Sequence, residues 1–132
     1  YDNVAEQVKA LAEGKGVDVA LDSVGKISFD ASLSSLKPRG WMISYGNASG
    51  AADPVPPGRL AQGGSLVLTR PTLFNFIDTP EALARGASLL FGALKAGTLK
   101  ADIGQRFALE DVADAHRALE SGKTTGATIL VP

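Results

Sequence analysis

Apolar and polar residues follow one another along this chain with two different spacings, one typical of helices and the other of strands. The first helix is predicted from apolar residues at helical spacing: Val4, Val8, Leu11 and Ala12. Asn3 and Glu6 stand three residues apart at the start of this helix, which is the spacing of a capping box. Gly14 and Gly16 follow the apolar pattern and are expected to end the helix.

Three short runs of apolar and β-branched residues predict β-strands: residues 17–21, 41–45 and 65–69. The second run is apolar at nearly every position, which is typical of a parallel strand covered on both faces, and Trp41 is expected in the core. The helix between the first two strands is predicted from three apolar residues: Phe29, Leu33 and Leu36. Pro38 and Gly40 are expected to break it.

The second half of the chain continues with a long irregular stretch at residues 46–64, rich in glycine, proline and alanine. Thr79 is then a predicted N-cap, with Pro80 in the first position of a helix that Gly97 ends. The buried stripe of this helix is predicted from five apolar residues: Leu83, Ala87, Leu90, Phe91 and Leu94. A short strand, a helix and a final strand complete the chain, predicted at residues 106–107, 112–119 and 127–131.

The alternation of strands and helices favours a parallel α/β sheet with helices on its faces. A complete dinucleotide-binding domain of this kind opens with a strand, a Gly-x-Gly-x-x-Gly turn and a helix, and this pattern is absent from the sequence. The first residues already lead into a helix. We therefore expect the chain to begin inside a domain and to form the second half of a Rossmann-type doubly wound parallel sheet.

The composition argues against several classes of protein. The 132 residues suit one compact domain, and a formal net charge of -1 leaves no basic patch for nucleic acid. No apolar run approaches the roughly 20 residues that span a bilayer, and the first residues lack the pattern of a signal peptide. Cysteine is absent and His116 is the single histidine, so no metal site is expected. The sequence thus predicts a cytoplasmic protein with no nucleic-acid or membrane partner.

Three loops follow the predicted strands, at residues 22–25, 45–50 and 69–72. Open parallel sheets bind ligands at the carboxyl ends of their strands, so these loops are the candidate site. Each contains small residues that let a ligand approach the backbone, together with a hydroxyl, an amide or a guanidinium group. A single loop of this kind is better explained as an ordinary turn, but three at one sheet edge favour a binding site.

Four runs of the sequence share their residues and spacing with one enzyme family: GVDVALDSVG from Gly16, ISYGNASG from Ile43, GSLVLTRP from Gly64 and DAHRALESG from Asp114. They resemble the quinone oxidoreductases of the medium-chain dehydrogenase/reductase superfamily. The resemblance covers essentially the whole chain in order and includes a final Gly-x-x-x-Leu-Val-Pro. The Thr-Arg-Pro and Gly-Asn-x-Ser-Gly segments are its more specific parts.

The resemblance implies a zinc-free reductase that transfers hydride from NADPH to a quinone or another conjugated carbonyl, such as an enone. It also implies that residues 1–100 belong to a nucleotide-binding domain and that residues 101–132 return to a catalytic domain. A homodimer is implied as well, formed through an edge strand that runs from Ser65 to Thr69.

Nine residues are implied as cofactor contacts by the same resemblance: Tyr1, Ser23, Tyr45, Gly46, Asn47, Leu68, Thr69, Arg70 and Lys123. Tyr1 matches a tyrosine near the adenosine 2′-phosphate, and Ser23 lies beside the adenosine. Residues 45–47 match the lining of the nicotinamide half, and residues 68–70 match the segment that meets the carboxamide. Lys123 directly follows the position where the family often places a basic residue on the cofactor phosphates.

No side chain of this sequence is assigned as a catalytic acid or base. His116 is expected to have a surface or packing role on its helix, away from the ligand edge. Asp22 either bonds a ribose or ends its strand, and the second interpretation is favoured. Arg70 either meets a ligand or pairs with a carboxylate. The alternative function is non-catalytic, in a soluble structural or dimerisation role, and a glycine-rich turn upstream of Tyr1 would argue against it.

Overall fold

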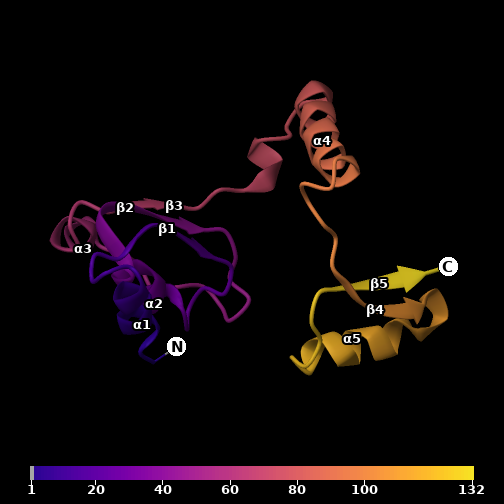
Figure 1. Cartoon of the computed structure of the whole chain (residues 1–132), viewed down its shortest axis with the longest axis horizontal. Coiled ribbons are helices and arrows are strands. Elements are labelled where there is room, and N and C mark those ends of the chain that lie inside the picture. Colours follow the sequence, from indigo (N-terminus) through magenta and orange to yellow (C-terminus); the bar gives the residue numbers. More distant parts are fainter. Residues whose placement is uncertain (1) are drawn as a thin grey trace. The chain divides into compact units, whose positions relative to one another are not determined.

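The computed structural model describes residues 2–132, so the predicted contact residue Tyr1 lies outside the described residues. The chain divides into two compact units, Tyr1–Phe76 and Ile77–Pro132, whose elements are labelled in Figure 1. We describe each unit by itself. The boundary near residue 100, predicted between a nucleotide-binding and a catalytic domain, differs from this division and stays a prediction.

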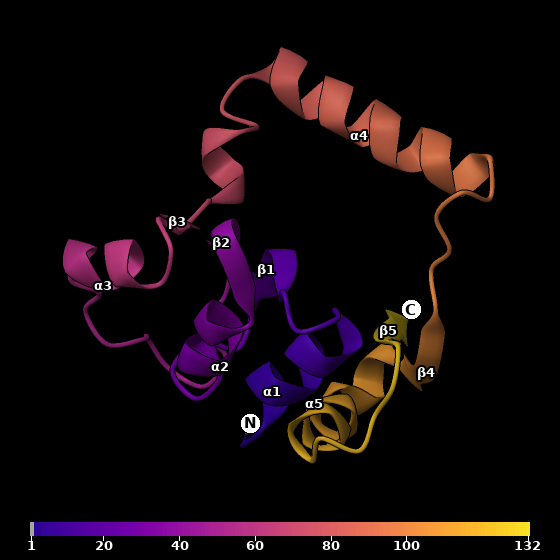
Figure 2. The same cartoon turned by 60° about the vertical axis from the view of Figure 1, so that its left-hand side comes forward.

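The first unit is built on a parallel sheet of three strands in the order β1-β2-β3. The strands are β1 (Val17–Asp22), β2 (Leu36–Ser44) and β3 (Val67–Thr69). The helices of this unit are α1 (Val4–Leu11), α2 (Phe29–Ser34) and α3 (Pro57–Gln62), with a short 3-10 turn η1 (Leu73–Asn75) after β3 (Figure 2). The three predicted strands and the first two helices are confirmed, whereas α3 lies in the stretch predicted to be irregular.

One face of this sheet carries the core of the first unit. The buried apolar residues come from α2, β2 and the segment before β3: Phe29, Leu33, Leu36, Met42 and Leu66. Met42 has 0% of its surface exposed, whereas its neighbour Trp41 is 50% exposed, because successive strand residues point to opposite faces. Trp41 is therefore not a core residue of this unit, and the predicted cover on both faces of the strand is wrong within it.

The boundary between α2 and β2 also differs from the prediction. Helix α2 ends at Ser34, and Leu36, predicted on its apolar face, is the first residue of β2 and pairs with Val17. The strand ladder is then interrupted around Arg39, which has a φ of 64°, and resumes at Trp41. The breakers Pro38 and Gly40 thus lie in an irregularity within the strand rather than between helix and strand.

The predicted capping box at the start of α1 is absent. Asn3 does precede the helix, but its backbone has a φ of 66° and its side chain makes no capping hydrogen bond. Its carbonyl oxygen accepts a hydrogen bond from the Gln7 amide at 3.0 Å. The left-handed backbone of Asn3 departs from the extended conformation that a side-chain cap requires.

The second unit contains one long helix and a small βαβ unit. Helix α4 is followed by a parallel pair of strands with α5 alongside (Figure 1), and their bounds are α4 (Pro80–Lys95), β4 (Ile103–Ala108), α5 (Val112–Glu120) and β5 (Ala127–Val131). The Thr79 hydroxyl caps α4 by accepting from the Ala82 amide at 3.1 Å, as predicted. Its apolar stripe is not buried in this unit, and Phe91 is 65% exposed. None of the described helices is both long and apolar enough to cross a membrane.

Candidate functional site

Two loops at the carboxyl edge of the first sheet are bonded directly to each other. The first loop (residues 23–28) follows β1, and the second loop (residues 45–50) follows β2. The Ser49 amide donates to the Val24 carbonyl at 2.8 Å. The Ser49 hydroxyl donates to the same carbonyl at 2.7 Å and accepts from the Ile27 amide at 3.2 Å. Ser49 therefore ties the two loops together, although it is not among the predicted contact residues.

Two glycines allow this close approach of the loops. A Cβ on Gly46 would lie 2.8 Å from the Cα of Ser23 and closer still to the Ser23 carbonyl oxygen. Gly25 has a φ of 88°, and a Cβ there would lie 2.5 Å from the carbonyl oxygen of Gly50. The loops thus pack backbone against backbone, at a separation that leaves no space for a side chain at Gly46 or Gly25.

A cavity of about 230 Å³ opens where these loops meet the end of β3. Four of the predicted contact residues line it: Gly46, Asn47, Leu68 and Arg70. Much of the rest of its wall is apolar and comes from α2 and the segment after the second loop: Phe29, Ala51, Ala52 and Val55. The predicted meeting of three loops at one sheet edge is therefore present in the structure. Asn47 and the Arg70 guanidinium are its polar groups best suited to orient a ligand.

The other predicted contact residues within the described part of the chain are not in the wall of this cavity. Ser23 is exposed and its backbone packs against Gly46, while Tyr45 and Thr69 are not part of the cavity wall. Lys123 is an exposed residue of the second unit, whose position relative to the first unit is not described.

The structure also shows the surroundings of Arg70 and His116, for which the sequence left alternatives open. The Arg70 guanidinium donates to the Pro71 carbonyl at 3.0 Å, and no carboxylate partner is found for it within residues 2–132. His116 is an exposed residue of α5, in the second unit, which is the surface alternative of the surface or packing role predicted for it.

The carboxylate of Asp22 lies behind the first loop and is only 3% exposed. Its Oδ1 accepts from the amides of Val24 and Gly25, both at 2.9 Å. Its Oδ2 accepts from the hydroxyls of Ser28 and Ser32, both at 2.7 Å. Both carboxylate oxygens are thus engaged by the protein itself, which supports the strand-end interpretation of Asp22 over a bond to a ribose.

The ionisation of Asp22 is shifted by this environment. Burial raises its pKa, but the hydrogen bonds from Gly25, Ser32, Ser28 and Val24 outweigh burial, so the pKa lies below its usual value. The folded protein therefore holds this carboxylate ionised at a pH where the unfolded chain already takes up a proton.

This shift predicts an acid-dependent loss of stability. A lowered folded-state pKa contributes stability that is present above the unfolded pKa of about 3.9 and is lost as the pH falls through the folded pKa. We expect the free energy of unfolding to fall below about pH 4, and to fall less steeply in Asp22→Asn, which has no carboxyl group to protonate. Urea unfolding at a series of pH values from about 6 to 2.5 measures both slopes. Parallel slopes in the two proteins would assign the acid lability to other carboxylates.

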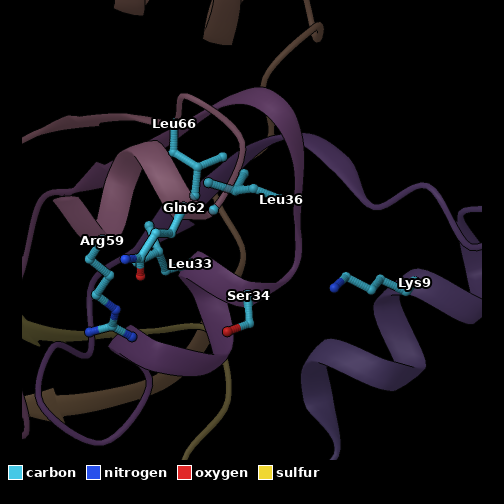
Figure 3. Close-up of a pocket in the computed structure, with 8 residues that line it drawn as sticks. Lys9, Leu33, Ser34, Leu36, Arg59, Gln62 and Leu66 are labelled. Atoms are coloured by element: carbon cyan, nitrogen blue, oxygen red, sulfur yellow. The ribbon is translucent and has the colours of Figure 1, made fainter. Parts of the chain in front are cut away.

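A larger cavity of about 360 Å³ lies at the opposite end of the same sheet. It lies among the ends of α1, α2 and α3, with the buried Leu33, Leu36 and Leu66 in its wall. Arg59 lies on one side of these leucines, and Lys9 faces them from α1 on the other (Figure 3). Arg59 forms an ion pair with Asp30 at 2.6 Å. Because this cavity faces the amino ends of β2 and β3, it is separate from the edge at which open parallel sheets bind nucleotides.

Comparison with known families defines the class of this protein. The chain belongs to the zinc-binding dehydrogenase family, whose model matches residues 1–130. Within residues 2–132 there is no group of three or more His, Cys, Asp or Glu side chains that could hold a metal ion. Zinc is thus part of the family's description, whereas the absence of zinc from this protein stays a prediction.

Within this family the chain is similar to quinone oxidoreductases, which confirms the resemblance found in the sequence. It is 47% identical to the quinone oxidoreductase of Pseudomonas aeruginosa over 132 residues, covering 100% of this chain and 41% of that protein. It is also 40% identical to the 2-haloacrylate reductase of a Burkholderia species, covering 97% of this chain and 39% of that protein. The chain thus spans about two fifths of the length of these curated relatives.

Solved structures confirm the predicted α/β fold class. The quinone oxidoreductase of Escherichia coli, solved in complex with NADPH, matches with a TM-score of 0.89 at 41% identity, over 99% of this chain and 41% of that one. A mycobacterial protein solved with NADPH matches with a TM-score of 0.90 at 42% identity, over 98% and 39% of the two chains.

Proposed function

We propose that this protein contributes the nicotinamide side of an NADPH site and that the complete protein reduces a quinone or a related conjugated carbonyl. The observation that carries the proposal is the cavity at the carboxyl edge of the first sheet, which four residues predicted as cofactor contacts line together. The quinone oxidoreductase relatives solved with NADPH support the choice of cofactor.

The cavity suits part of a dinucleotide rather than the whole molecule. Its volume of about 230 Å³ is below the range of roughly 300–1,000 Å³ that is typical of sites for complete ligands. Leu68 and the other apolar residues of the wall suit the faces of a nicotinamide ring, and Asn47 and Arg70 supply polar groups for its carboxamide or the adjoining phosphate. The bound cofactor would supply the hydride, so the role of these residues is to orient the ring and limit the access of water.

The remaining predicted contacts belong to the same proposal. Ser23 is assigned to the adenosine side, Tyr45 and Thr69 to the nicotinamide half, and Lys123 to the cofactor phosphates. Tyr1 is assigned to the adenosine 2′-phosphate and would favour NADPH over NADH. These roles rest on the resemblance to quinone oxidoreductases.

Calorimetry and a reductase assay on the complete gene product test this function. We expect NADPH to bind more tightly than NADH, and NADPH oxidation to depend on an added quinone such as a benzoquinone. An Arg70→Ala variant is expected to bind NADPH more weakly because it removes a cationic group from the cavity wall. A complete gene product that binds neither cofactor would reject the proposal and favour the non-catalytic alternative.

We further propose that β3 is the contact strand of a homodimer. It is an edge strand of the sheet, pairing with β2 on one side, and it is shorter than predicted because Ser65, with a φ of 58°, lies outside it. Val67 pairs with Trp41 on the face of the sheet that has no cover within this unit. Edge strands with apolar residues readily pair with a second chain.

A charge at the centre of this contact is therefore expected to weaken the dimer. Val67→Lys should raise the dimer dissociation constant at least about tenfold, because pairing would bury an ammonium group near its copy in the partner. The matched control is Val67→Thr, which keeps the β-branched shape without a charge. Analytical ultracentrifugation over a range of concentrations measures both variants, and an unchanged dimer in Val67→Lys would place the interface elsewhere.

A further inference from the structure

Asp22 is connected to both loops that form the candidate site. Its side chain accepts the amides of Val24 and Gly25 in the first loop. Its backbone carbonyl oxygen accepts the amides of Tyr45 at 2.8 Å and Gly46 at 3.3 Å, where the second loop begins. One residue at the end of β1 thus holds the start of each loop.

The second loop depends in turn on the conformation of the first. The Val24 carbonyl accepts both the amide and the hydroxyl of Ser49, and the Lys26 amide donates to the Gly50 carbonyl at 3.0 Å. The first loop can present these groups only while it stays folded around the Asp22 carboxylate. Because Gly46 then lines the cavity, the order of this network sets the shape of the cavity wall.

Ser28 and Ser32 provide the support for the carboxylate itself. Both hydroxyls donate to Oδ2, Ser28 from the position before α2 and Ser32 from within it. Oδ1 accepts the two loop amides, and the Ser28 hydroxyl also lies 2.9 Å from it. The two serine hydroxyls thus hold the carboxylate, and Oδ1 in turn holds the amides of the first loop. No charged side chain donates to this carboxylate among the described residues.

We propose that Asp22 is the positioning residue of the candidate site: it fixes the first loop, on which the second loop is built, and thereby shapes the cavity for the cofactor. Asp22 acts through these loops and does not itself contact the bound molecule. The part of this inference that concerns the cofactor rests on the proposed function, whereas the part that concerns loop order does not.

Three substitutions test this inference through hydrogen exchange of the complete protein. Asp22→Ala removes the acceptor for one buried and one partly buried amide. Amides of the first and second loops should therefore exchange at least about tenfold faster, with residues 41–43 of β2 as the unchanged reference. Asp22→Asn keeps one oxygen for the same amides, and the serine hydroxyls can turn to accept from its amide group. It should therefore restore exchange to within about threefold of the wild type. The matched control is Asp30→Asn on α2, which removes only the exposed ion pair with Arg59 and should leave exchange in both loops unchanged.

Cofactor kinetics provide a second readout. Asp22→Ala should raise the KM for NADPH about tenfold while kcat stays within about threefold, since the loops lose their order but the reacting atoms are untouched. Ser49→Ala, which removes the hydroxyl that links Val24 and Ile27 to the second loop, should speed exchange at Ile27 and in the second loop, and should raise the same KM less.

Each outcome decides the inference. Uniformly faster exchange in Asp22→Ala, including β2, would reduce Asp22 to a general stabilising residue and overturn the proposal, as would an Asp22→Asn variant as disturbed as Asp22→Ala. If Asp22→Ala does not fold, unchanged exchange and an unchanged KM in Ser49→Ala would overturn it. If the wild-type protein binds no NADPH, the proposed function fails, and the exchange data alone decide whether Asp22 orders the loops.

Discussion

Gly46→Ala is expected to separate the two loops and to cost the protein both stability and cofactor affinity. The added methyl group would lie 2.8 Å from the Cα of Ser23 and closer still to its carbonyl oxygen, and both are backbone atoms that cannot rotate away. Overpacking of this kind costs typically about 1–3 kcal/mol, and we expect the upper part of that range because the first loop is held by Asp22 and Ser49. We also expect NADPH affinity to fall at least tenfold, about 1.4 kcal/mol, because Gly46 lines the cavity.

Gly58→Ala provides a matched control with the same chemical change. Gly58 lies in α3, and a Cβ there would meet no atom within 4 Å. Alanine is favoured over glycine inside a helix by roughly 0.5–1 kcal/mol, so this variant should be slightly more stable than the wild type and bind NADPH equally well. Urea unfolding and calorimetry measure both quantities for both variants. If Gly46→Ala behaves like Gly58→Ala, the loops are free to move apart and the site is looser than the structure indicates.

The elements that the sequence predicted correctly are those with signals close together in the chain. Helix α4 begins at Pro80 after Thr79, as predicted, because a side-chain cap and a first-turn proline act within a single turn. The strands were located because β-branched and apolar runs identify them without reference to their neighbours. Parallel pairing followed from the alternation of strands with helices.

The errors arise where the outcome depends on distant contacts. An apolar run does not reveal which face of a strand is covered, so Trp41 and Met42 could not be distinguished by composition. Leu36 fits the spacing of α2, but it pairs with Val17 across a strand ladder that no local pattern encodes. The error at Phe91 in α4 has the same cause. The spacing of apolar residues shows that a helix has an apolar face, but it does not show which part of the protein covers that face.

The candidate site was predictable in its location but only partly in its residues. The carboxyl ends of parallel strands determine the edge of the sheet, so the cavity residues Gly46, Asn47, Leu68 and Arg70 lie together as expected. Thr69 follows Leu68 directly, and alternation along a strand turns it toward the other face. Asp22 was recognised as a strand end, but its role depends on serines six and ten positions further along the chain, a spacing with no simple periodic signal.

The 132-residue chain on its own is expected to show no measurable NADPH:quinone reductase activity, although it can fold. Its described residues provide a cavity of about 230 Å³, and the sequence has no Gly-x-Gly-x-x-Gly turn to hold a pyrophosphate. β1 is an edge strand of the described sheet, so its outer backbone groups lack strand partners there.

Without the Gly-x-Gly-x-x-Gly turn, the isolated chain should have no useful affinity for NADPH. Charge-assisted hydrogen bonds contribute roughly 1.5–3 kcal/mol each, so the absence of three of them weakens binding by at least about a thousandfold. Calorimetry with NADPH on the purified chain, beside the complete gene product, measures this directly, and circular dichroism shows whether the isolated chain is folded. Micromolar binding by the folded chain alone would contradict the expectation and would mean that the loops held by Asp22 suffice to bind the cofactor.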